Sequence, residues 1–158
     1  MIRLPQGYYG EYNQFSLEHK DIVMVVTGNT TGKSVIVHNE KGDKILLNQN
    51  AIRLRVKENY DSYYVDMVIK SKYFQYLLKY SLYQSVQPFI SLDFLNKVHI
   101  PIIDDELIEK ISKLYSQNLS NLYLSKQLIQ EAKQDVEDLI EGNFDMAKLN
   151  DTTTESRW

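Results

Sequence analysis

Residues 104–141 read DDELIEKISKLYSQNLSNLYLSKQLIQEAKQDVEDLIE and contain neither proline nor glycine. Apolar side chains recur along them in steps of three and four residues, from Leu107 to Ile140, which is the spacing of one face of an α-helix. Acidic residues open the segment, where the positive end of a helix dipole favours anions, and Gly142 suits a C-terminal stop. The sequence therefore predicts a single long helix over residues 104–142.

The apolar stripe of this helix predicts a helical partner. At about 1.5 Å per residue the helix spans roughly 57 Å, which is more than a small body can cover. We expect it to pair in a coiled coil with a second copy of the chain, and a polar interruption at residues 125–127 helps to fix the register. The expected pairing face comprises Ile111, Leu114, Leu122, Leu128, Ile129, Ala132, Val136 and Leu139. Residues 143–158 are polar and predict a disordered tail.

Residues 1–103 predict a small β-rich domain with short helices. Apolar, β-branched runs at 21–26, 34–37, 45–47 and 51–56 are typical of strands, separated by glycine- and asparagine-containing turns. The spacing then changes to that of two short helices, over 63–69 and 73–78, joined at Ser71-Lys72. A loop is expected over 82–90, a helical turn capped by Ser91 after it, and a last strand at Val98–Ile100. The predicted fold class is α+β, with a domain over 1–103 followed by the long helix.

Composition limits the class of protein. The chain has 158 residues and no cysteine, which excludes disulfides, thiolate metal sites and cysteine nucleophiles. Neither a membrane-length apolar run nor the apolar core of a signal peptide is present, so we expect a soluble cytoplasmic protein without a membrane partner. The net charge of −3 conceals an asymmetry, because residues 1–103 carry +3 and residues 104–142 carry −5. The body can therefore face phosphate although the whole chain is acidic.

Catalytic and cofactor motifs fail on spacing or context. Residues 28–34, GNTTGKS, look like a P-loop, but that motif needs four residues between its glycines and a helix after its lysine. Here three residues intervene and a β-branched run follows, so a tight turn between strands is predicted. His19, His38 and His99 lack metal-ligand spacing. We therefore predict no catalytic residue, metal or cofactor in this chain.

An ordered set of short stretches carries a resemblance to a known family. The set is Asp21-Ile22-Val23 with Thr27-Gly28 and Gly32-Lys33, then LNQNAIRL at 47–54, SVQPFIS at 85–91 and Ile100-Pro101. It resembles a target recognition domain, the DNA-reading module in specificity subunits of Type I restriction–modification systems. The long helix, with SKQLIQEAK at 125–133, resembles the helical spacer that follows such a domain. The resemblance covers about residues 20–142 and corresponds to one half of a subunit.

The resemblance implies a non-catalytic function. Such a domain binds one half of a split double-stranded DNA target, and its helix fixes the distance to the other half. Partner methyltransferase and restriction subunits supply methyl transfer from S-adenosylmethionine and the cleavage that uses ATP and magnesium. The implied partners are therefore DNA, these subunits and a second copy of the chain.

Two loops and several cations are the candidates for DNA contact. Asn, Thr, Gln and Ser side chains donate to and accept from base edges, and the base-contact candidates are Asn29, Thr30, Thr31, Tyr83, Gln84, Ser85 and Gln87. The DNA-backbone candidates are Lys33, Arg53, Arg55, Lys57, Lys70, Lys72 and Lys79. For both sets the alternative is ordinary solvated surface. We expect the twelve tyrosines to serve core and rim packing rather than base stacking.

Two other functions stay open at this point. The first is a protein–protein adaptor that binds its partner through the acidic C-terminal helix and uses the body as a scaffold. The second is a small metal-dependent nuclease, since Glu18-His19-Lys20 contains a Glu-x-Lys pair. No acidic partner precedes that pair at the end of a predicted strand, which argues against the nuclease.

Overall fold

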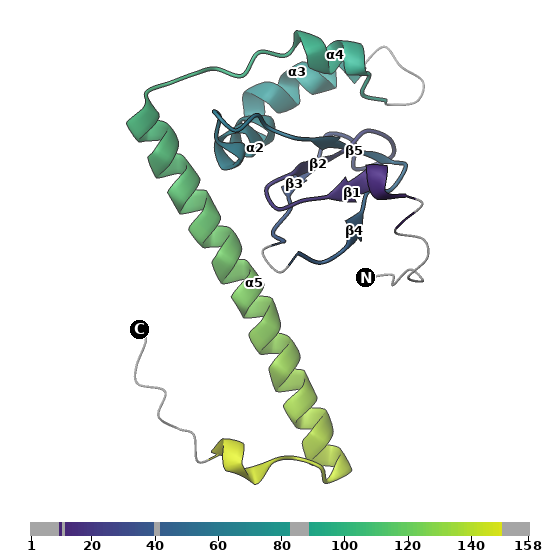
Figure 1. Cartoon of the computed structure of the whole chain (residues 1–158), viewed down its shortest axis with the longest axis vertical. Helices are drawn as coiled ribbons and strands as arrows, with labels where there is room; N and C mark the ends of the chain where they lie inside the picture. The colour runs from purple at the N-terminus through teal and green to yellow at the C-terminus, as the bar shows by residue number, and fades with distance from the viewer. Residues whose placement is uncertain (1–9, 11, 40–41, 83–88, 150–158) are drawn as a thin grey trace. The chain divides into compact units, whose positions relative to one another are not determined.

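A computed structural model describes residues 10, 12–39, 42–82 and 89–149 (Figure 1). The elements are η1 (Asn13–Phe15), β1 (Ser16–Leu17), β2 (Ile22–Val25), β3 (Ser34–Ile36), β4 (Ile45–Leu46), β5 (Ala51–Leu54), α2 (Ser62–Lys70), α3 (Lys72–Leu82), α4 (Leu92–Lys97), α5 (Asp105–Glu141) and η2 (Met146–Leu149). Short antiparallel strands, short helices and one long helix confirm the mixed α+β class. By its contacts the chain divides into two compact units, Met1–Tyr115 and Ser116–Trp158, so the first turns of α5 belong to the N-terminal unit.

The strands form two small antiparallel sheets. β2 is the central strand of a three-stranded sheet of order β3-β2-β5, in which Met24 pairs with Ser34 on one side and Ile52 on the other. Burial alternates along β2, with Ile22 and Met24 fully buried, because successive side chains of a strand point to opposite faces. β1 and β4 form a separate pair, with Leu17 opposite Ile45.

Two of the short helices begin at residues whose side chains cap them, and the sequence predicted one of these caps, Ser91. Asp61 precedes α2 and accepts a 2.7 Å hydrogen bond from the Tyr64 amide, and Ser91 does the same for the Phe94 amide of α4 at 3.1 Å. Ser71 separates α2 from α3, as the sequence predicts. α5 closes at Gly142, whose φ of 77° is the left-handed conformation that glycine adopts at little cost.

The core of the N-terminal unit is built from the sheet and the first two helices. α2 packs against β3 and α3 (Figure 1). The buried apolar side chains are Leu17, Ile22, Met24, Val26, Ile36, Tyr64, Ile69, Phe74, Leu78 and Ile90. Over the described residues, no helix combines the length and the apolar character that a membrane crossing requires.

Two segments differ from the expectations. Val98–Ile100 is a connection after α4 and not a strand, because β-branched side chains favour extended backbone but do not supply a neighbouring strand to bond with. The polar tail, expected to be disordered from residue 143, begins with a 3-10 turn, η2, from which Lys148 reaches Asp135 of α5 at 2.5 Å. The loop expected over 82–90 lies mostly outside the described residues.

Candidate nucleic-acid interface

The β2–β3 loop is a tight, internally bonded turn, as the sequence predicts. Gly28 has a φ of 92°, and its carbonyl accepts the Thr31 amide at 3.1 Å and the Thr31 hydroxyl at 2.6 Å. The Gly32 amide then donates to the Val25 carbonyl at 2.8 Å, which closes the loop. Thr31 Oγ1 is therefore used within the loop, whereas Asn29 and Thr30 are exposed at its tip.

Helix α3 holds the base of this loop. Gly32 is buried, and a Cβ atom built on it would lie 2.1 Å from Leu78 Cδ2. Gln75 Nε2 donates to the Gly32 carbonyl at 3.1 Å and to the Ile69 carbonyl at 2.8 Å. These contacts fix the loop against the core, so the exposed Asn29, Thr30 and Lys33 are presented from a rigid support.

The second predicted loop ends beside the first. Phe89 forms an isolated antiparallel bridge with Thr27, and the Ile90 amide donates to the Val26 carbonyl at 3.1 Å. Thr27 immediately precedes Gly28. Phe89, near the C-terminal end of the second predicted loop, therefore pairs with the residue that precedes the first loop. The candidates Tyr83, Gln84, Ser85 and Gln87 themselves lie outside the described residues.

A third polar turn, residues 48–50, lies beside Thr27 and was not among the predicted DNA-contact residues. Residues 48–50, Asn-Gln-Asn, are exposed, and the Asn50 carbonyl accepts the Val26 amide at 2.9 Å. Thr27 Oγ1 lies 3.2 Å from Asn50 Oδ1. The signal was present as a run of amides before β5, but only the pairing of β5 with β2 places it beside Thr27.

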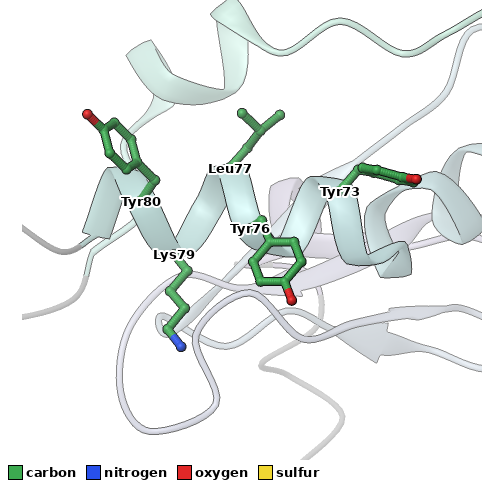
Figure 2. Close-up of a pocket in the computed structure, with 5 residues that line it drawn as sticks. All are labelled: Tyr73, Tyr76, Leu77, Lys79 and Tyr80. Carbon is green, nitrogen blue, oxygen red and sulfur yellow. The ribbon is translucent and has the colours of Figure 1, made fainter.

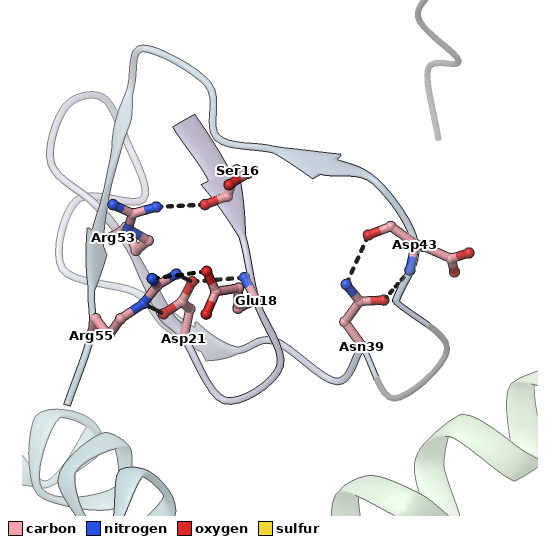
Figure 3. A network of polar contacts seen from close by, with 7 residues as sticks. All are labelled: Ser16, Glu18, Asp21, Asn39, Asp43, Arg53 and Arg55. Carbon is pink, nitrogen blue, oxygen red and sulfur yellow. Dashed lines mark hydrogen bonds and ion pairs between the residues drawn. The ribbon is translucent and has the colours of Figure 1, made fainter. Parts of the chain in front are cut away.

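Two of the DNA-backbone candidates, Arg53 of β5 and Arg55 directly after it, are engaged within the body (Figure 3). Arg55 forms two hydrogen bonds of 2.7 Å with the carboxylate of Asp21 and an ion pair of 2.9 Å with Glu18. Arg53 Nη1 donates to the Ser16 carbonyl at 2.5 Å. Both guanidinium groups therefore bind the β1–β2 region of the body.

The Asp21–Arg55 pair shifts the pKa of both its members. Burial alone would raise the pKa of Asp21, but hydrogen bonds from Arg55 and from the Glu18 amide outweigh it and hold the pKa below its ordinary value. The hydrogen bond to Asp21 raises the pKa of Arg55 in turn. The pair therefore stays charged near neutral pH.

Lys70 is also engaged, through a buried carboxylate that the sequence did not reveal. Asp66 is fully buried and accepts from Ser34 Oγ at 2.6 Å, from Tyr115 at 2.6 Å and from Lys70 Nζ. Burial, and then the hydrogen bond to Asp66, raise the pKa of Tyr115. Ser34, which stood in the P-loop-like stretch, thus serves the core and not a phosphate.

The other candidate cations lie at the surface. Lys33, Lys57, Lys72 and Lys79 are exposed, and Lys72 Nζ lies 5.2 Å from the centre of the Tyr73 ring. The exposed ammonium groups of these lysines can bind DNA phosphates, and ordinary solvation accounts for their exposure equally well.

Several tyrosines depart from the expected core and rim packing. Tyr73, Tyr76 and Tyr80 project from successive turns of α3 and are strongly exposed (Figure 2). The prediction made no distinction among the twelve tyrosines. The outward face of a short helix cannot be identified before the packing of its other face is known.

The residues of the nuclease hypothesis have other partners. Glu18 pairs with Arg55, and Lys20 Nζ lies 5.6 Å from the centre of the Tyr63 ring. His19 Nδ1 accepts the Asn39 amide at 3.2 Å. In the described part of the chain, no group of three or more His, Asp or Glu side chains is placed to hold a metal ion.

The expected pairing residues of α5 are mostly exposed. Leu122, Leu128 and Val136 are 52–56% exposed, whereas Ile111 is half-buried in the N-terminal unit. A shallow groove surrounds Ser125 and is lined by Asn121, Leu124, Leu128, Ile129 and Ala132.

No protein-family model matches the chain, and no curated protein matches it.

Proposed function

We propose that this chain is a sequence-specific DNA-binding module of a restriction–modification system and corresponds to half of a Type I specificity subunit. It reads one half of a bipartite double-stranded target and positions methyltransferase and restriction subunits on it. The chain itself contributes no catalytic group. S-adenosylmethionine, ATP and magnesium act in the partner subunits.

The bridge between Thr27 and Phe89 is the observation that carries this proposal. Because of it, the β2–β3 loop starts where the second polar loop ends, and the Asn-Gln-Asn turn at 48–50 joins them through Asn50. Polar side chains able to recognise base edges are thus supplied beside Thr27 from two described parts of the chain, the tip of the β2–β3 loop and the turn at 48–50. A protein that reads several adjacent bases needs polar side chains from different segments close together.

The second part of the proposal, pairing of two copies of the chain, rests on the long helix α5. Its exposed leucine, isoleucine and valine side chains favour a coiled coil with α5 of a second copy. In an antiparallel pair, one recognition domain would stand near each end of the rod, and the target would be an inverted repeat with an unread spacer.

A selection from random DNA duplexes, followed by a salt series on the selected sequence, tests the proposal. A protein that neutralises several phosphates loses affinity steeply as salt rises, with a slope that counts those phosphates. We expect a selected sequence, a steep slope, and weaker binding to a scrambled duplex. Binding that ignores sequence contradicts the proposal.

The adaptor function is favoured by one observation, the exposed apolar stripe on an acidic helix. An adaptor needs no DNA affinity at any salt concentration. The same salt series therefore separates the two functions, because an adaptor gives no binding even in the lowest salt.

A further inference from the structure

Helix α3 is apolar on two sides. Phe74 and Leu78 face the core and are 4% and 2% exposed. On the other side, Tyr73, Tyr76, Leu77 and Tyr80 are 59–82% exposed and, with Lys79, line a shallow groove (Figure 2). These five residues, together with Lys72, are called the outer face of α3 below.

The spacing of the outer face is that of a helix-packing surface. Positions 73, 76, 77 and 80 are i, i+3, i+4 and i+7, which form one continuous ridge over about two turns. Such a ridge is normally covered by another element. In the described part of the protein these side chains stay uncovered.

The charged side chains of α3 itself, Lys72 and Lys79, are all of one sign. Residues 67–92 contain no aspartate or glutamate, while Lys70, Lys72 and Lys79 are present. Lys70 is bound to Asp66, so Lys72 and Lys79 at the two ends of the outer face supply its charge. An apolar centre between cationic ends complements an apolar stripe flanked by carboxylates.

We propose that the outer face of α3 is a docking surface for an acidic, amphipathic helix of a partner protein. Tyr76, Leu77 and Tyr80 take the apolar side of that helix, and Lys72 and Lys79 pair with its carboxylates. The proposal goes beyond DNA recognition and does not rest on it.

A protein helix fits this surface better than nucleic acid does. Leu77 is among the residues that line the groove, and an aliphatic side chain gains nothing from a phosphate backbone. Tyrosines are among the residues that dominate binding energy at protein interfaces, and a leucine gains free energy when a partner removes it from water.

The probe for the test is the synthetic peptide EELLEELAKELLEELA, which is apolar on one side of a helix and strongly acidic. Its sequence differs from that of α5, so its binding is separate from the proposed pairing of α5 with α5. Fluorescence anisotropy of the labelled peptide is followed on titration with the whole chain. We expect saturable binding that weakens as salt rises and that L77D and the pair Y76S/Y80S reduce about tenfold or more. A peptide with its carboxylates changed to amides should bind more weakly.

Matched variants decide which surface binds. Y60S removes an exposed tyrosine outside α3 and should leave binding unchanged. Unaltered thermal unfolding of L77D shows that the variant folds, since Leu77 is exposed. No binding overturns the proposal, as does binding lost only in L128D, which would place the peptide on α5. Affinity for a 20-base-pair duplex that falls in Y76S/Y80S while peptide binding persists would make nucleic acid the occupant and equally overturn it.

Discussion

The hydroxyl of Tyr115 donates a 2.6 Å hydrogen bond to the carboxylate of Asp66, forty-nine positions earlier in the chain. Asp66 is fully buried and also accepts from Ser34 of β3 and Lys70 of α2. A second bond lies one helical turn earlier, where Ser112 Oγ donates to Asp61 at 2.5 Å. The first turns of α5 are therefore fastened to the body by hydrogen bonds to two carboxylates on or next to α2.

Y115F removes one of these hydrogen bonds and leaves the ring in place. We expect it to lower the free energy of unfolding by about 1–2 kcal/mol, because the buried Asp66 carboxylate loses a donor that water cannot replace. Chemical denaturation followed by circular dichroism measures the change. Y76F is the control, since its hydroxyl is on an exposed side chain, and equal effects of the two variants would contradict the role given to Tyr115.

Gly32 and Gly28 form a matched pair for the loop. Both have positive φ, at 88° and 92°, but a Cβ at Gly32 would overlap Leu78 whereas nothing lies within 4 Å of a Cβ at Gly28. We expect G28A to cost about 1 kcal/mol of stability from backbone strain alone, and G32A about 1–3 kcal/mol more from overpacking. Thermal unfolding of both variants measures the difference, and similar losses would mean that α3 does not hold the loop.

The ion pair between Asp21 and Arg55 predicts a dependence of stability on pH. The pKa of Asp21 is lower in the folded than in the unfolded chain, so its contribution is complete above the unfolded value. It is lost as pH falls from about 4 through the folded value. Denaturation at a series of pH values should show this loss, and D21N should weaken it while costing about 1–3 kcal/mol at neutral pH. D43N changes an exposed carboxylate, and an acid transition that it altered as much as D21N would exclude this origin.

Local signals in the sequence predicted most of the elements. Ser91 was predicted as a helix cap and Ser71 as part of the joint between two short helices, and the long run without glycine or proline predicts α5 as one helix. The glycines of the 28–32 loop were interpreted as a tight turn, which the hydrogen bonds of Thr31 and Gly32 confirm.

What the sequence did not predict depends on contacts between distant positions. Lys70 and Arg55 look like free surface cations until Asp66 and Asp21 are placed beside them by the packing of α2 and by the sheet. Asn50 gains its place in the candidate surface from a strand pairing that no local pattern encodes. The outward direction of Tyr76 likewise follows from the burial of Phe74 and Leu78 on the same helix.

The two classes of DNA contact predict different mutant behaviour. N29A or Q87A should shift or relax the preferred sequence by about 1–3 kcal/mol for each lost base contact. K33A and K57A should weaken binding to every sequence and flatten the salt slope. Lys70 is unsuitable for this comparison, because K70A also removes a partner of Asp66. Anisotropy titrations on matched and scrambled duplexes measure both effects, and equal losses on every sequence for all variants would reject the loops as base readers.

The spacing of large and small side chains on α5 supports the proposed dimer. Leu122, Ile129 and Val136 recur every seven residues, and the smaller Ser125 and Ala132 lie between them. The groove around Ser125 is the hollow that such a pattern leaves on a helix surface. In an antiparallel pair, large side chains of one helix can fill the hollows of the other, and a polar residue at such a position restricts the register.

L122D combined with L128D should therefore separate the two copies. A carboxylate buried in the seam costs several kcal/mol, so the variant should be monomeric at tens of micromolar, where we expect the parent chain to be a dimer. Light scattering measures the mass, and Q117A, at an exposed position outside the assigned pairing face, is the control. The monomer should also lose most of its affinity for an inverted-repeat duplex, because two linked sites bind far more tightly than one. A parent chain that is already monomeric, or a footprint that covers a single half-site, would contradict a dimer formed by α5.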